Sequence, residues 1–184
     1  MRATRLFFAL CAVAVSVPSA SAGTGRQASE DAVKAAFLPK FVRYIELPAS
    51  VRPEAGQPFY LCVIGRDPFG QGLDRAAANE IVDGRPIAVR RFANADAAAV
   101  TGCHAAYVAG TNAQQTTQIL ATLRRQPTLT ITDSRWGQPR GMIHFAVEGA
   151  RVRFHIDDAA AAGDGIGISS RLLALAVDVK QRPQ

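Results

Sequence analysis

The apolar positions of the chain alternate between two patterns, one typical of buried strands and one typical of helices. Residues 59–65 form a continuous apolar run, 104–109 a shorter apolar strand, and further strands are expected at 86–92 and 128–132. Runs of this length without polar interruption are typical of strands that are buried on both faces. Helical patterns over 67–78 and 116–125 separate these strands, so the order predicts an α/β fold with a mixed, largely parallel sheet flanked by helices.

A helix is also expected before the first strand, because apolar residues recur there at spacings of three and four. These residues are Val33, Phe37, Phe41, Tyr44 and Ile45. Pro39 lies inside the pattern and is expected to kink or divide the helix, and Pro48 to end it. Residues 23–29 are small and polar and predict a flexible lead-in. Asp67 and Pro68 read as the N-cap and first residue of the helix over 67–78.

The segment 141–157 predicts a C-terminal antiparallel hairpin that turns at Glu148 and Gly149. In that register one face is apolar and carries Ile143, Phe145, Val147, Ala150, Val152 and Phe154. The other face is basic and carries His144, Arg151, Arg153 and His155, with His144 opposite Arg153. After the hairpin, Asp158 caps a helical turn, glycines at 163, 165 and 167 form a flexible loop, and Ser169 or Ser170 caps a last helix from Arg171 to about residue 179.

The N-terminus has the features of a secretory signal peptide. Arg2 and Arg5 precede an apolar run over 6–17, and Ala20-Ser21-Ala22 supplies the small residues that signal peptidase requires, so we expect cleavage before Gly23. The alternative, a membrane anchor, is disfavoured because the run is much shorter than the roughly 20 residues that span a bilayer. We therefore expect a signal peptide over 1–22 and a single exported domain over 23–184, located in the periplasm.

Charge and cysteine content add two constraints. The formal net charge of +6 is scattered along the chain, which argues against a nucleic-acid partner. Cys11 leaves with the signal peptide, whereas Cys62 and Cys103 remain. Two cysteines in an oxidising compartment are candidates for a disulfide, and two buried free thiols are the alternative.

The sequence points to binding rather than catalysis. It has no nucleophile elbow, zinc-protease motif or phosphate-binding loop, and we expect no catalytic residue, no bound metal and no cofactor. His144, Arg153 and His155 are a candidate docking face for an acidic partner or a small anion, with an ordinary solvated sheet face as the alternative. Ser169, Ser170 and Arg171 form a second polar cluster, which either binds a partner or only caps the last helix.

Several stretches in the order of the chain resemble the YfiR family of periplasmic proteins. They include Val33-Lys34-Ala35-Ala36-Phe37-Leu38, Leu61-Cys62-Val63-Ile64-Gly65-Arg66-Asp67-Pro68-Phe69-Gly70, Cys103-His104-Ala105-Ala106-Tyr107-Val108, Gly141-Met142-Ile143-His144-Phe145 and Ile168-Ser169-Ser170-Arg171-Leu172-Leu173. Pro39, Leu47, His155 and Asp157 depart from the family pattern, and a later cysteine pair found in some members is missing.

The resemblance implies a regulator that binds the periplasmic region of a membrane-bound diguanylate cyclase and represses it. Repression would lower cyclic di-GMP and biofilm formation. The resemblance also implies a homodimer and a redox response, and Cys62 and Cys103 match the family's early cysteine positions. A periplasmic small-molecule-binding sensory domain is the alternative.

Overall fold

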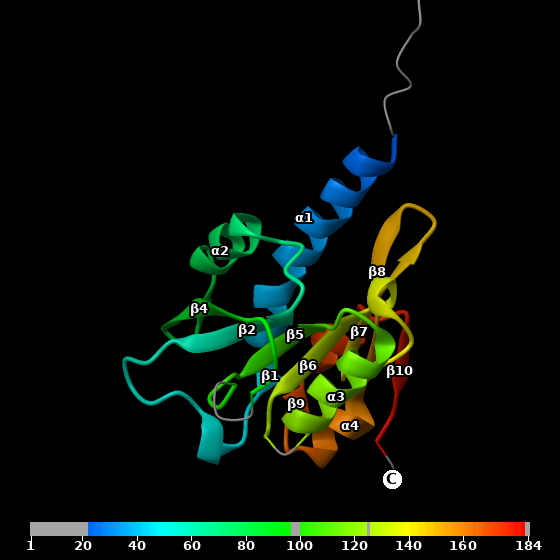
Figure 1. Cartoon of the computed structure of the whole chain (residues 1–184). Coiled ribbons are helices and arrows are strands. Elements are labelled where there is room, and N and C mark those ends of the chain that lie inside the picture. Colours follow the sequence, from blue (N-terminus) through cyan, green and yellow to red (C-terminus); the bar gives the residue numbers. More distant parts are fainter. Residues whose placement is uncertain (1–21, 97–99, 125, 183–184) are drawn as a thin grey trace, which may run out of the picture.

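The computed structural model describes residues 22–96, 100–124 and 126–182, so the predicted signal peptide over 1–22 lies outside the described residues except for Ala22. In the described part, an eight-stranded sheet has the strand order β10-β8-β7-β6-β5-β2-β4-β3, beside a two-stranded ribbon of β1 and β9 (Figure 1). The strands are β1 (Ile45–Glu46), β2 (Phe59–Gly65), β3 (Ile81–Val82), β4 (Arg85–Phe92), β5 (Ala105–Ala109), β6 (Leu129–Asp133), β7 (Ile143–Glu148), β8 (Arg151–Asp157), β9 (Gly167–Ile168) and β10 (Asp178–Lys180). The helices are α1 (Ala22–Arg43), α2 (Gln71–Ala78), α3 (Ala113–Leu123), α4 (Asp158–Gly163) and α5 (Ser170–Leu173), with 3-10 turns at Ala49–Val51 and Ser134–Trp136.

The centre of the sheet is parallel. β4, β2, β5, β6 and β7 pair in parallel, and β8 then returns antiparallel to β7. Alternate side chains of β2 enter two different cores, since Leu61 and Val63 pack toward α1 while Cys62 and Ile64 pack toward α3. This arrangement confirms the predicted α/β class with a largely parallel sheet and a C-terminal hairpin.

The first helix is longer and more regular than the sequence predicts. α1 begins at Ala22, so residues 23–29 are helical and the predicted flexible lead-in is wrong. The helix also continues through Pro39 to Arg43 and is not divided. Phe37 and Phe41 stack on one another with ring centroids 5.9 Å apart, and Phe41 lies 5.5 Å from Phe145 and 5.1 Å from Phe154. This aromatic packing against the hairpin stabilises the helix despite the hydrogen bond that proline cannot donate.

The hairpin is present, but its predicted register is wrong by two residues. Glu148 pairs with Arg151, so the turn consists of Gly149 and Ala150 rather than Glu148 and Gly149. Gly149 has a φ of +63°, and Ala150 is not among the described residues with positive φ. A type II′ turn needs glycine at its first central position, which explains why the turn starts one residue later. A shift of two residues keeps each side chain on its face, so the apolar face is still present. Ala150 moves into the turn, and Ile156 joins the face by pairing with Ile143.

Two predicted helix boundaries are also corrected. α2 begins at Gln71, and the Asp67 carboxylate accepts hydrogen bonds from the Phe69 and Gly70 N–H groups, so Asp67 closes a turn before the helix instead of capping it. α5 is capped by Ser169 as predicted, but it ends at Leu173. The chain then forms β10, which pairs in parallel with β8 at the sheet edge. Among the described residues, no helix has both the length and the apolar character needed to cross a bilayer.

Candidate functional site

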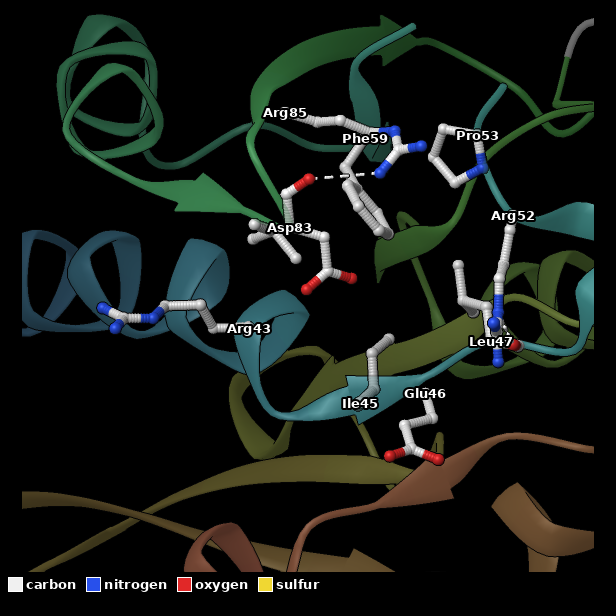
Figure 2. A pocket seen from close by; sticks show the side chains of 10 residues that line it. Arg43, Ile45, Glu46, Leu47, Arg52, Pro53, Phe59, Asp83 and Arg85 are labelled. Atoms are coloured by element: carbon white, nitrogen blue, oxygen red, sulfur yellow. Dashed lines mark hydrogen bonds between the residues drawn. The ribbon is translucent and has the colours of Figure 1, made fainter. Parts of the chain in front are cut away.

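The short β1–β9 ribbon is surrounded by open hollows. Ile45 pairs with Ile168 and Glu46 with Gly167, and the Ser169 N–H donates to the Tyr44 carbonyl at 2.9 Å. Because this ribbon lies outside the main sheet, it leaves hollows of about 490, 610 and 340 Å³ around Glu46, which lines all three. Figure 2 shows the first of them, between the end of α1 and the β3–β4 turn.

Five arginines border these hollows, and we call them the arginine rim: Arg43, Arg52, Arg85, Arg171 and Arg182. Arg43 pairs with Glu80 at 3.1 Å, yet about half of its side chain (54%) stays exposed. Arg182 forms two hydrogen bonds with the buried carboxylate of Asp158, at 2.7 and 3.0 Å. Arg52 donates from Nε to the Leu47 carbonyl at 2.8 Å. These contacts fix the direction of the side chains while leaving guanidinium N–H groups free to bind another molecule.

Two acidic side chains, Glu46 and Asp83, lie among the rim arginines. Figure 2 shows the Asp83 carboxylate and the Arg52 and Arg85 side chains around the same hollow. Arg85 donates to the Asp83 carbonyl at 3.2 Å, which holds the guanidinium at the mouth. Glu80 and Asp158 already pair with Arg43 and Arg182, so four carboxylates stand against the five arginines. A small excess of positive charge remains, which favours an acidic partner surface or an anionic group.

A buried charged cluster lies at the carboxyl edge of the parallel sheet. The Lys34 ammonium of α1 contacts the Asp133 carboxylate of β6 at 2.7 Å, and both side chains are at most 1% exposed. The Asp133 carboxylate also accepts from Arg135 at 3.2 Å and from the Tyr107 hydroxyl at 3.4 Å. Burial alone would raise the pKa of Asp133, but the hydrogen bond from Lys34, the Arg135 N–H and the two positive charges together lower it. Asp133 is therefore ionised at neutral pH.

Sequence reasoning missed this cluster, although a signal for it was present. Lys34 lies four and seven residues before Leu38 and Phe41, on the face of α1 that enters the core. A lysine on such a face requires a buried anionic partner. Around the cluster, Trp136 donates to the Tyr107 hydroxyl at 2.7 Å and Arg135 pairs with Asp31 of α1 at 2.6 Å. The contacts tie α1 to the end of β6 and give the cluster a structural role.

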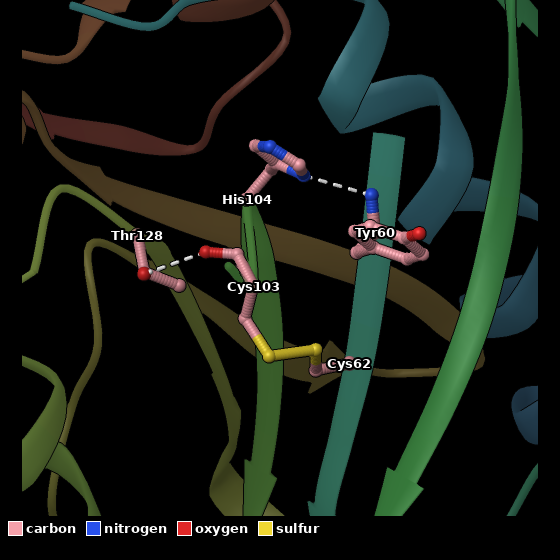
Figure 3. Close-up of a disulfide and its surroundings, with 5 residues drawn as sticks. All are labelled: Tyr60, Cys62, Cys103, His104 and Thr128. Atoms are coloured by element: carbon pink, nitrogen blue, oxygen red, sulfur yellow. Dashed lines mark hydrogen bonds between the residues drawn. A yellow bond between two sulfur atoms is a disulfide. The ribbon is translucent and has the colours of Figure 1, made fainter. Parts of the chain in front are cut away.

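The predicted cysteine pair forms a disulfide. Cys62 on β2 and Cys103 just before β5 are bonded, with Cα atoms 5.8 Å apart (Figure 3). Next to it, the Tyr60 N–H donates to Nδ1 of His104 at 2.8 Å, and the Thr128 hydroxyl donates to the Cys103 carbonyl at 2.7 Å. Burial lowers the pKa of His104, which keeps Nδ1 available as an acceptor. The disulfide and these two hydrogen bonds thus form a buried set of contacts that holds β5 against β2 and β6.

Comparison with known protein families assigns the chain to one of them. A model of the YfiR/HmsC-like family matches residues 31–177, which is most of the chain. The chain belongs to the YfiR/HmsC-like family. Its members are periplasmic regulatory proteins of cyclic di-GMP signalling rather than enzymes. No curated protein matches the chain.

In this YfiR/HmsC-like protein, the predicted binding residues are divided between two regions, the arginine rim and the hairpin. Ser169 and Arg171 line the second hollow of the arginine rim, and Ser170 is the exposed first residue of α5. Arg153 is exposed and lines a separate apolar groove with Phe37 and Val152. His144 and His155 lie on the same face of the hairpin as Arg153, opposite to the face of Phe145 and Phe154.

The predicted basic face keeps its members, but the predicted pairing of His144 with Arg153 is wrong. His144 lies opposite His155 rather than Arg153, with ring centroids 6.5 Å apart, and only 4% of His144 is exposed. Its Nδ1 is 2.8 Å from the Thr132 hydroxyl. Burial, with a smaller contribution from Arg140, lowers the pKa of His144 to about 4, so it is neutral at physiological pH. Within the described residues, no group of three or more His, Cys, Asp or Glu side chains is arranged to hold a metal ion.

Proposed function

We propose that this protein is an exported repressor that binds the periplasmic region of a membrane-bound diguanylate cyclase through its arginine rim. Binding would hold the cyclase in an inactive arrangement, lowering cyclic di-GMP and biofilm formation. Membership of the YfiR/HmsC-like family carries the proposal, because it supplies the signalling context. The rim supports it by offering a basic surface on a scaffold held by the disulfide and by the Lys34–Asp133 pair.

The charge of the rim indicates the chemistry of the partner. Guanidinium groups bind carboxylates in a planar, two-pronged geometry, so the complementary surface should carry Asp and Glu side chains. The hollows between the arginines give such side chains, or an apolar side chain beside them, a place to enter. Complementary charges of this kind increase the association rate and set specificity.

We also propose that the protein is exported as a single domain and forms a homodimer. The signal peptide over residues 1–22 would deliver the domain 23–184 to the compartment where the disulfide forms. Cys62–Cys103 would then keep the repressor in its binding-competent shape. If the Cys62→Ser/Cys103→Ser protein folds and represses like the wild type under oxidising conditions, this role of the disulfide is wrong.

The binding experiment uses the periplasmic region of the cyclase encoded nearest to this gene. We expect Arg52→Glu/Arg171→Glu to weaken its Kd at least about tenfold, mainly through slower association, and high salt to reduce the difference. Arg75→Glu is the matched control, because Arg75 is exposed on α2 and lies outside the rim. Equal affinities for wild type, rim variant and control would exclude the rim as the docking surface.

A further inference from the structure

A separate cavity of about 370 Å³ lies at the amino ends of β6 and β7, away from the arginine rim. Its wall includes Leu120 of α3, Arg124 just after that helix, and Arg140 and Met142 before β7. Asp157 at the end of β8 and Asp164 after α4 complete the charged lining. Its volume is at the lower end of the range for ligand pockets, roughly 300–1,000 Å³, so the cavity suits a small molecule.

The charged groups around this cavity do not balance one another. Asp157 is satisfied, since its carboxylate accepts from the Ala160 N–H at 2.8 Å and from the Lys180 ammonium at 2.9 Å. The guanidinium groups of Arg124 and Arg140 form neither a hydrogen bond nor an ion pair with any other described residue. Asp164 is the one acidic group left to oppose these two arginines in the lining, and an excess of one positive charge remains.

This imbalance limits the charge of a ligand. Two forked guanidinium groups can hold one carboxylate with several charge-assisted hydrogen bonds. Asp164 and the carboxyl end of α3, which carries partial negative charge, would oppose a second negative charge. The cavity is therefore better matched to a monoanion than to a dicarboxylate or a phosphate ester.

The remaining wall is largely apolar, and its polar residue Thr130 already accepts a hydrogen bond from the Met142 N–H at 3.1 Å. Leu120 and Met142 are each only 5% exposed, so they present a small apolar contact area at the edge of the core. Methionine beside leucine adapts to branched or aromatic groups. We propose that this cavity binds a small monocarboxylate with an apolar body, the carboxylate lying between Arg124 and Arg140 and the body against Leu120 and Met142. No lining residue of the cavity belongs to the rim, so this inference does not rest on the proposed cyclase partner.

The test measures direct binding by isothermal titration calorimetry. The protein is purified from the periplasm of cells that express the full chain, and the probes are sodium 4-methylpentanoate, 3-phenylpropanoate and benzoate, each compared with its neutral amide. We expect at least one acid to bind while its amide binds at least about tenfold more weakly, because the amide lacks the charge-assisted hydrogen bonds. Arg124→Gln and Arg140→Gln should each weaken that acid about tenfold, with Arg75→Gln as the matched control.

Asp164→Asn separates the possible ligand classes. Because Asp164 opposes an anion, this variant should bind the acid as tightly as the wild type or more tightly. If no acid binds better than its amide, or if both arginine variants bind like the control, the site is wrong. The zwitterion leucine is titrated as a further probe. If it alone binds and Asp164→Asn abolishes that binding, the monocarboxylate assignment is wrong.

Discussion

At the scale of single residues, the buried charges determine how stability responds to mutation and pH. Lys34 and Asp133 are enclosed between α1 and β6, whereas the rim arginines Arg43 and Arg182 keep about half of their side chains exposed (54% and 48%). Removing one partner of a buried pair leaves the other charge without compensation in a medium of low polarity. The same substitution at an exposed pair changes stability much less.

Asp133→Asn tests the buried pair. We expect the free energy of unfolding in urea to fall by about 3 kcal/mol, because Lys34 keeps its charge but loses its anionic partner. Lys34→Met/Asp133→Leu should recover part of this loss, and the exposed Asp178→Asn serves as the control. Since the pKa of Asp133 is lowered in the folded state, its contribution is present at neutral pH and is lost as pH falls toward that lowered value. A loss below about 1 kcal/mol for Asp133→Asn would contradict this role.

His144 predicts a second dependence on pH. Its pKa falls from 6.5 to about 4 on folding, so the unfolded chain binds the proton more tightly and stability is lost as pH falls from 6.5 toward 4. His144→Gln can keep a hydrogen bond to Thr132 without titrating. We expect the loss of unfolding free energy between about pH 7 and pH 5 to be smaller in this variant, by at most ~2 kcal/mol. Identical pH profiles for variant and wild type would show that His144 is not held neutral by burial.

At the scale of elements, the sequence predicts long buried strands well and short edge pieces poorly. β2 and β5 are continuous apolar runs, which periodicity identifies directly. β1, β9 and β10 have only two or three residues each, too few for any period, and tertiary pairing alone defines them. The arginine rim surrounds two of these short strands, so its five arginines cannot be grouped from the sequence. Of the residues that line its hollows, the sequence singles out only Ser169 and Arg171.

The disulfide links β2 covalently to the residue that precedes the neighbouring strand β5. It closes a loop with a sequence separation of 41 residues, and in the chain-entropy model this restriction of the unfolded state contributes about 4 kcal/mol. We expect Cys62→Ala/Cys103→Ala to lower Tm by roughly 8–16 °C for a domain of this size. Wild type treated with a thiol reductant while unfolded and then refolded should show a comparable decrease. An unchanged Tm in the double variant would show that the bond adds no stability.

At the scale of the whole molecule, the contacts that stabilise the fold lie apart from the proposed docking surface. The buried cluster and the disulfide hold α1, β2, β5 and β6 together. The basic surface lies around the β1–β9 ribbon, where substitutions do not reach these contacts. The Arg52→Glu/Arg171→Glu variant, which leaves the Arg182–Asp158 pair intact, should therefore fold normally and fail only in binding, which makes a cellular test interpretable.

The most direct test is cellular cyclic di-GMP in a strain that lacks this gene. We predict a rise on deletion that is reversed by the exported wild-type protein and by Arg75→Glu. A copy without residues 1–22 and the Arg52→Glu/Arg171→Glu variant should both fail to reverse it, although the rim variant is exported and folded. If deletion leaves cyclic di-GMP unchanged while the wild-type protein is expressed and exported, the protein does not repress a diguanylate cyclase.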